Sequence, residues 1–268
     1  VEPIVMIYFN KLRRSMRVWR KTDGGSLPLE IGVRALGWLE ANRARFNPFL
    51  DPRRVDPLKV KALSELGFAC LVGLQSEVPE FAERFRRLAD HTLDIVEANE
   101  FGSVVAENPT LVAALATFEA LGRQLGRLPC RSLPALDSLV AHNSLESTER
   151  CSFQRMDFFY SLGQIGTDLA VAPTLAELYR ETLLATRPEA PFLDNRDSYC
   201  ITHVVFYLTA MGRVRPDLSA GDLAAVQQLI RTLLGLYLRR GDLDLLAECL
   251  TCHYQLRSAP GPLAEASW

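Results

Sequence analysis

Apolar residues recur at helical spacing through most of this chain, and this periodicity constrains the fold more than any other feature. Leu63, Leu66 and Cys70 are three and four residues apart, and Leu229 and Leu233 repeat the spacing. A helix places such side chains on one face, where they can be buried together. Strand-like alternation is almost absent after the first few residues. The sequence therefore predicts an all-α fold.

Capping residues and prolines divide this pattern into separate helices. Asp56-Pro57 and Asn108-Pro109 place a capping side chain before a proline, which the first helical turn tolerates. Ser219 and Asp242 are further predicted caps, and Gly241 is a predicted stop. The predicted helices cover residues 30–45, 57–74, 79–98, 109–124, 133–142, 148–163, 173–185, 197–211, 220–239 and 243–257.

Short connections between these helices predict antiparallel helical hairpins. We expect the hairpins to form an α/α toroid or a curved array, and the lack of a strict internal period disfavours a consensus repeat protein. Residues 1–28 form a basic N-terminal extension in this prediction. Residues 29–268 form a single all-helical domain, and residues 187–197 are a loop within it.

Composition excludes several classes of protein. The chain has 268 residues, is 48% hydrophobic and carries a formal net charge of −2. A disordered chain would have lower hydrophobicity and higher charge, and a nucleic-acid-binding protein would have a basic excess. We find no apolar run long enough for a membrane span and no secretory signal. We therefore expect a cytoplasmic protein without nucleic-acid or membrane partners.

The common catalytic motifs are missing from the sequence. It contains no GxGxxG after a strand, no phosphate-binding loop, no GxSxG, no HExxH, no EF-hand pattern and no DDxxD run. We therefore predict no cofactor from a motif, and zinc is the one candidate that individual residues raise.

Polar residues interrupt the apolar stripes of three helices in the C-terminal half. Asp157 lies in an aromatic stretch, where a carboxylate is costly unless it is paired or hydrogen-bonded. If buried, it would suit acid–base chemistry, but the favoured alternative is that it pairs with an arginine of a neighbouring helix or bonds a backbone group. On the next helix, for which Asp197 or Ser198 is the expected cap, Cys200, His203 and Tyr207 share a face.

The third helix carries Glu248, Cys249, Cys252 and His253, and two interpretations compete for the combined set. One is a zinc site, with Cys200 or His203 from one helix and Cys249, Cys252 and His253 from the other. Zinc binds thiolate and imidazole tetrahedrally and activates water at an open position. The alternative is that the cysteines are small buried hydrophobic residues.

The second functional interpretation of these residues is an acid–base site that needs no metal. His203, Asp157, Tyr207, Glu248 and His253 would then point into a central cavity of the helical array. Imidazole exchanges protons near neutral pH, and a carboxylate can orient it. We predict His203 as general acid/base, Asp157 or Glu248 as its orienting partner, and Tyr207 as a hydrogen-bond donor. His203 and Tyr207 could also be hydrogen-bonded core residues without a catalytic role.

Several stretches resemble a known family. They are residues 201–212 (ITHVVFYLTAMG), residues 37–40 and 46–49 (GWLE and FNPF), and Asp157 with Tyr160. Together they resemble an uncharacterised family of all-helical actinobacterial proteins, some of which lie near natural-product biosynthesis genes. The resemblance covers roughly residues 30–257. That family commonly has an acidic residue where this chain has Ala210, so no acid–base role is carried over to this position.

These observations lead to three functional hypotheses. The first is a small-molecule tailoring enzyme or cyclase of specialised metabolism with acid/base residues in a helical cavity. The second is a non-catalytic helical binding or scaffold module, and the third is a zinc-binding helical protein. The expected partner is a small-molecule substrate, and a homodimer is a candidate assembly.

Overall fold

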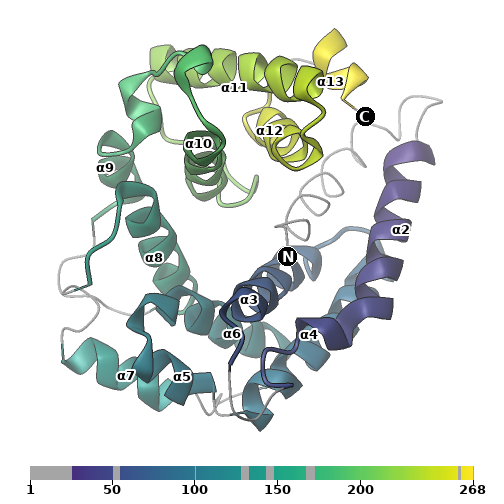
Figure 1. The fold of residues 1–268 in the computed structure, drawn as a ribbon, viewed down its shortest axis with the longest axis vertical. Coiled ribbons are helices and arrows are strands. Elements are labelled where there is room, and N and C mark those ends of the chain that lie inside the picture. Colours follow the sequence, from purple (N-terminus) through teal and green to yellow (C-terminus); the bar gives the residue numbers. More distant parts are fainter. Residues whose placement is uncertain are drawn as a thin grey trace. The chain divides into compact units, whose positions relative to one another are not determined.

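The computed structural model describes residues 26–50, 55–99, 101–127, 133–142, 148–166, 173–258 and 261–267. These residues contain twelve α-helices, labelled α2 to α13, four short 3₁₀-helices and no strand (Figure 1). The chain is therefore all-α, as the apolar periodicity predicts. Among the described helices, none is long and apolar enough to cross a membrane.

The helices follow one another along the chain with short connections. Their bounds are α2 Ser26–Asn42, η1 Arg43–Phe46, α3 Pro57–Gly73, α4 Pro79–Ala98, α5 Phe101–Glu107, η2 Pro109–Leu111, α6 Val112–Leu125, α7 Leu133–Ala141, α8 Ser152–Gln164, α9 Leu175–Arg180, η3 Leu183–Thr186, η4 Ala190–Phe192, α10 Asn195–Leu208, α11 Ala220–Arg240, α12 Leu243–Gln255 and α13 Pro262–Ala266.

Each of the ten predicted helices coincides with helical structure, and the predicted caps explain where several begin. The Asp56 carboxylate accepts hydrogen bonds from the N–H groups of Leu58 and Lys59. Ser219 and Asp242 cap α11 and α12 in the same way, and Gly241 ends α11 with a φ of 68°. The sequence misses α5 and α13, because helices of seven and five residues are too short to show a clear period.

Contacts divide the chain into two compact units. The first contains residues up to Glu149 and Ser161–Ala170, and the second contains Arg150–Tyr160 and residues from Val171. The predicted loop 187–197 lies inside the second unit. The toroid or curved array and the single domain over residues 29–268 stay predictions. Most of the basic extension predicted over residues 1–28 lies outside the described residues.

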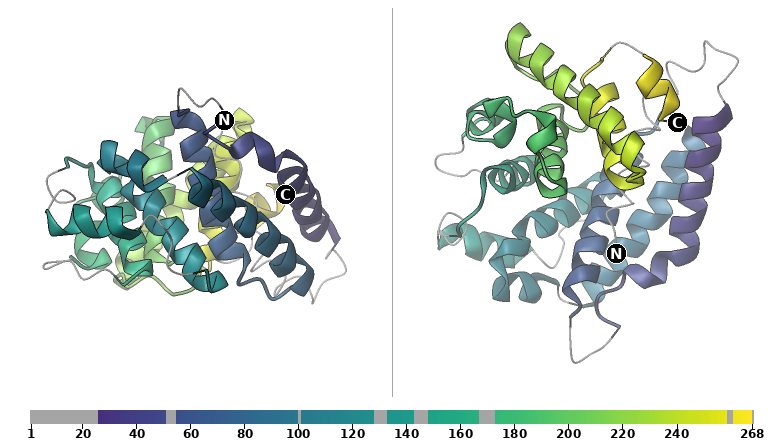
Figure 2. Two further views of the ribbon diagram at one scale, coloured as in Figure 1. Left: turned by 90° about the horizontal axis from the view of Figure 1, so that it is seen from below. Right: turned by 45° about the horizontal axis from the view of Figure 1, so that its top comes forward.

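In the first unit α3, α4 and α6 pack against one another, as the views in Figures 1 and 2 agree. The α4 stripe that includes Phe81, Phe85 and Leu88 is buried. Gly73, at the end of α3, lies so close to Phe85 that a Cβ atom there would overlap the aromatic ring. Phe101 on α5 and Phe118 on α6 meet edge to face with centroids 5.1 Å apart, so aromatic rings also pack between α5 and α6.

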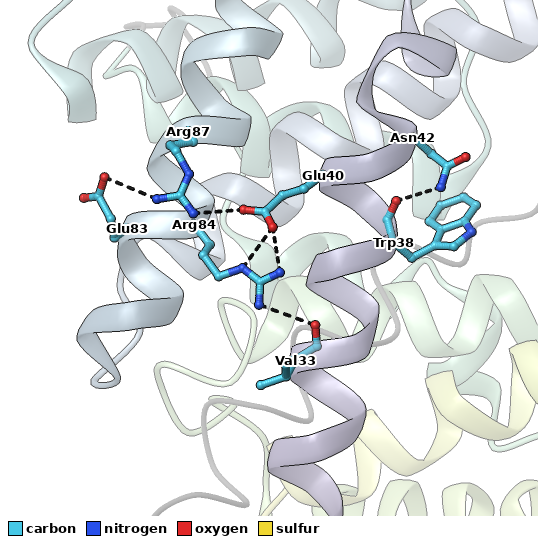
Figure 3. Close-up of polar contacts among 7 residues, drawn as sticks. All are labelled: Val33, Trp38, Glu40, Asn42, Glu83, Arg84 and Arg87. Atoms are coloured by element: carbon cyan, nitrogen blue, oxygen red, sulfur yellow. Dashed lines mark hydrogen bonds and ion pairs between the residues drawn. The ribbon is translucent and has the colours of Figure 1, made fainter.

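An ion-pair network joins α2 to α4 (Figure 3). The Arg84 guanidinium donates to Glu40 Oε2 from Nε at 3.0 Å and from Nη2 at 2.6 Å, and Arg87 donates to Oε1 at 3.1 Å. These bonds hold the pKa of the half-buried Glu40 carboxyl below its ordinary value. Trp38, on the same helix, is 51% exposed.

In the second unit α12 packs against both α10 and α11 (Figure 1). The buried face of α11 includes Val226, Ile230, Leu233 and Tyr237. The Tyr237 hydroxyl donates a hydrogen bond of 2.7 Å to Ser198 on α10. The three helices therefore form one core, and this core carries every residue that the sequence proposes as catalytic except Asp157, which lies on α8.

Candidate functional site

The N-terminus of α10 is fixed by a cap that the sequence places three or four residues too late. Asp194, not Asp197 or Ser198, is the capping residue. Its carboxylate accepts from the Asp197 N–H at 2.8 Å, and the Asp197 carboxylate accepts from the Asp194 N–H at 3.3 Å. This reciprocal arrangement is a capping box, in which Asp197 takes the third helical position. It fixes Asn195 as the first residue of α10, the helix that carries His203.

A row of polar contacts joins α10 to α12. The donor and acceptor pairs are Tyr199 with Asp244, Thr202 with Glu248, and Thr209 with Gln255. The partners advance in the same direction along both helices, so α10 and α12 run parallel. Of these six residues the sequence predicts only Glu248 as a site residue, because a polar side chain has no pattern that tells which helix it faces.

Glu248 is the deepest charged group of this row. Its side chain is completely buried, and the Thr202 hydroxyl donates a hydrogen bond to Oε2. The other oxygen, Oε1, lies 3.7 Å from Nε2 of His203, whose side chain is 27% exposed. A buried carboxylate thus faces an imidazole that solvent or a ligand can reach. Such a carboxylate can orient an imidazole and stabilise its protonated form.

Aromatic rings surround the His203 imidazole. The centroid distances are 6.1 Å to Phe153, 5.8 Å to Phe206 and 6.3 Å to Tyr207, and the Phe153 and Tyr207 rings meet the imidazole edge to face. Phe153 comes from α8, and the other two come from α10. The imidazole therefore has a carboxylate on one side and apolar walls on others, which limits its contact with water.

Tyr207 and Asp157 form a second set of polar contacts beside His203. The Tyr207 hydroxyl donates to Asp157 Oδ1 at 3.0 Å, so Asp157 binds the predicted hydrogen-bond donor. Burial and the Asp157 charge raise the pKa of Tyr207, which keeps the phenol protonated. Asp157 also acts electrostatically on Arg150. The carboxylate that lies within ion-pair distance of His203 is Glu248.

A turn with left-handed backbone angles follows α10 and places Arg213 next to Tyr160. Ala210, Met211 and Gly212 have φ values of 43°, 58° and 83°, which strain the two residues that are not glycine. The turn therefore ends α10 at Leu208, three residues before the predicted end at residue 211. Arg213 then donates from Nη2 to the Tyr160 hydroxyl at 2.9 Å.

The other predicted residues of α12 lie in the core. His253 is buried, five residues after Glu248, and its ring packs edge to face on Tyr254 at 5.6 Å. Cys249 and Cys252 are also buried, and burial raises the pKa of both thiols. The Cys252 thiol donates a weak hydrogen bond to the Thr202 carbonyl oxygen at 3.6 Å. These contacts match the interpretation of the two cysteines as small buried residues.

The zinc site predicted from Cys200, Cys249 and Cys252 is not assembled in the described part of the chain. No three His, Cys, Asp or Glu side chains in that part lie together as metal ligands. Cys200 is half-exposed on α10, whereas Cys249 and Cys252 are fully buried on α12. Zinc binding stays a prediction.

A pocket of about 410 Å³ lies elsewhere in the second unit. Its walls come from α11 and from the segment of residues 184–191. Among the described residues that line it there is none of the predicted site residues. The predicted central cavity around His203 stays a prediction.

Comparison with known protein families places most of the chain in one of them. The model of a family described as "Domain of unknown function (DUF6895)" matches residues 32–268. The chain belongs to the DUF6895 family. No curated protein and no solved structure matches it. The DUF6895 region extends over parts of both compact units and includes every predicted site residue, so the polar groups around His203 and Asp157 are part of the family's domain.

Proposed function

We propose that this DUF6895 chain is a small-molecule enzyme in which His203 is the general acid/base. One observation carries the proposal: a partly exposed imidazole lies 3.7 Å from a carboxylate that is completely buried. Burying a carboxylate is expensive unless other groups compensate it. Here Thr202 and His203 are the compensating groups. The proposal explains why α12 places a carboxylate at this position.

Each group has a distinct part in the proposed reaction. His203 accepts a proton from the substrate and returns it at another atom, so that no external acid or base is consumed. Glu248 is a positioning residue, because it is buried and acts through His203. The charge of Glu248 stabilises the imidazolium that forms when His203 takes up the proton. Thr202 fixes the second carboxylate oxygen.

The surroundings of His203 favour an apolar or aromatic substrate. Phe153, Phe206 and Tyr207 surround the imidazole at centroid distances near 6 Å. Aromatic walls bind apolar molecules and stabilise positive charge that develops in a bound substrate. Both properties suit a tailoring enzyme or cyclase of specialised metabolism. We propose this context, with a cytoplasmic location, and a mechanism in which residues of the chain transfer the protons.

A non-catalytic binding module is the second candidate function. The observation that favours it is the pocket on α11, whose volume lies in the range of small-molecule sites. Leu184, Val226 and Leu229 line it, and Arg187 and Gln228 are among its polar lining residues. In this alternative the chain binds a ligand at α11, and His203 serves only the core.

Loss of turnover tests the enzyme proposal. We would incubate the purified chain with small-molecule extract of its source organism and record by untargeted mass spectrometry which compounds are consumed. His203→Gln should reduce the consumption rate at least about 100-fold, because a general acid/base contributes this much or more. Circular dichroism would show that the variant keeps its helices.

His142→Gln is the matched control for this experiment. His142 is exposed and follows α7, where its Nδ1 lies 2.7 Å from the Ser138 carbonyl oxygen. This variant should consume the same compounds at the wild-type rate. Equal rates for the wild type and for His203→Gln would contradict the proposed role of His203.

A further inference from the structure

Two cysteines lie on the accessible side of the second unit, apart from the buried ones. Cys151 is exposed, and Cys200 is half-exposed in the second turn of α10. Cys70, Cys249 and Cys252 are buried, and burial raises the pKa of each of these three thiols. Oxidants therefore reach the first two thiols more easily than the other three.

Cys151 occupies the N-cap position of α8. Its carbonyl oxygen accepts the Arg155 N–H at 3.0 Å, which is the first hydrogen bond of the helix. Both its N–H and its thiol donate to Gln154 Oε1, at 3.2 and 3.1 Å. The exposed Cys151 thiol at this helix start is open to an oxidant from solvent.

Side-chain contacts join the start of α8 to the part of α10 that carries Cys200 and His203. Phe153, two residues after Cys151, meets the ring of His203 at 6.1 Å, and His203 lies one turn after Cys200. This contact places the first turn of α8 beside the third turn of α10, and the Tyr207–Asp157 bond repeats the same offset of 50 residues, so the chain just before Phe153 lies level with the turn that carries Cys200. Burial, followed by the Cys151 group, raises the pKa of the Cys200 thiol.

We propose that Cys151 and Cys200 form a peroxide-sensitive disulfide that ties the start of α8 to α10. The proposal does not depend on the function proposed for His203. In the first step the Cys151 thiolate attacks a peroxide oxygen, which gives a sulfenic acid at Cys151 and releases water when the leaving hydroxide takes a proton. In the second step Cys200 sulfur attacks the sulfenic sulfur, and the hydroxyl group leaves as a second water.

The balance of this reaction is complete. Two thiols lose two electrons and two protons in total, and one molecule of hydrogen peroxide accepts them and becomes two molecules of water. The Cys151 thiol gives up its bond to Gln154 in the process. The bond would hold Phe153 against His203, because Cys151 and Phe153 are part of the same helix start.

The test treats the full chain with hydrogen peroxide and maps its thiols. Cys130 lies outside the described residues, so the experiment uses a Cys130→Ser background. Protease digestion and mass spectrometry should identify a peptide pair joined through Cys151 and Cys200, lighter than the two free peptides by two hydrogen atoms. Reductant should restore both thiols. The buried Cys70, Cys249 and Cys252 should stay reduced and serve as internal controls.

Two variants decide between this cross-link and separate oxidation. In Cys200→Ser, Cys151 should proceed to sulfinic acid or to a disulfide between two copies of the chain. In Cys151→Ser, Cys200 should stay reduced, because burial raises its pKa and leaves little thiolate. Separate oxidation of Cys151 in the chain that contains both cysteines, without the joined peptides, would overturn the proposal.

Discussion

Glu248 is a carboxylate that the fold removes completely from solvent, and its immediate neighbours determine what it can do. A lone buried charge would destabilise the chain by several kcal/mol, so it must be compensated. Thr202 donates to one oxygen and His203 lies beside the other. Only His203 of these three is partly open to solvent. The chemistry at this position therefore reaches a ligand through the imidazole.

Tyr207 and Asp157 allow a first prediction about stability. Tyr207→Phe removes the hydroxyl that donates to Asp157 at 3.0 Å and leaves a half-buried carboxylate with one donor fewer. We expect the free energy of unfolding in urea to fall by about 1–3 kcal/mol. Tyr179→Phe is the control, since that hydroxyl has no hydrogen-bond partner among the described residues and its loss should cost less than about 0.5 kcal/mol. Equal losses in both variants would contradict the role of the bond.

The sequence predicts the residues of this site better than it predicts their pairing. His203 is recognisable because it precedes the apolar run of residues 204–206, where a polar ring needs a partner. Which of two carboxylates lies beside it depends on the packing of α10 on α12, which periodicity does not give. Thr202 escapes notice because a hydroxyl inside a helix is common, and often bonds only to the backbone.

At the scale of elements, Gly73 determines how closely α3 approaches α4. Gly73→Ala would place a Cβ atom into the Phe85 ring, and displacing a buried ring costs about 1–3 kcal/mol. Gly163, on α8, has nothing within 4 Å of the position that a Cβ atom would take. Gly163→Ala should therefore stabilise the chain by up to about 1 kcal/mol. Urea unfolding measures the change in the free energy of unfolding, which should fall in Gly73→Ala and rise in Gly163→Ala. Destabilisation by both substitutions or by neither would refute this account of the packing.

The stability that the ion pairs between α2 and α4 contribute depends on pH, because Glu40 is one of the partners (Figure 3). Arg84 lowers the pKa of Glu40 below its ordinary value of 4.5 in the folded chain. A carboxyl with a lowered folded pKa adds stability above its unfolded pKa and loses it as the pH falls through the folded pKa. At pH 7 Glu40→Gln should therefore be less stable than wild type by about 1 kcal/mol.

This difference between wild type and Glu40→Gln should shrink as the pH falls below about 4.5. Glu40 of the wild type is then increasingly protonated, and so becomes neutral like the glutamine of the variant. Urea unfolding at pH 7, 5 and 3 follows it. Glu83→Gln is the matched control on α4, where the exposed Glu83 pairs with Arg87 at 3.7 Å and should contribute less than about 0.5 kcal/mol. A Glu40 effect of equal size at pH 7 and pH 3 would show that charge is not its cause.

Helices with strong local signals are predictable from the sequence, and their ends are predictable where a cap acts locally. Asp56, Ser219 and Asp242 accept bonds from N–H groups two or three residues ahead, so nearby sequence suffices to find them. The end of α10 is different. Ala210 and Met211 adopt left-handed φ values, which local preference disfavours, and contacts of the folded unit must enforce them.

At the scale of the whole molecule, periodicity predicts helices but not how they are grouped. The division into two units passes through α8, whose residues to Tyr160 belong to the second unit while the remainder belongs to the first. A continuous helical pattern over residues 148–163 gives no sign of this division. The match to the DUF6895 family extends over both units, so the family's domain is larger than the core that holds His203.

The most direct test of the central claim is the turnover rate of Glu248→Gln alone and combined with His203→Gln, on a compound that the wild type consumes. If Glu248 acts only by positioning and charging His203, each single variant loses at least about 100-fold in kcat with a smaller change in KM. The double variant should then lose no more than His203→Gln does. Single losses that multiply in the double variant, or full turnover in Glu248→Gln, would contradict an acid–base unit of His203 and Glu248.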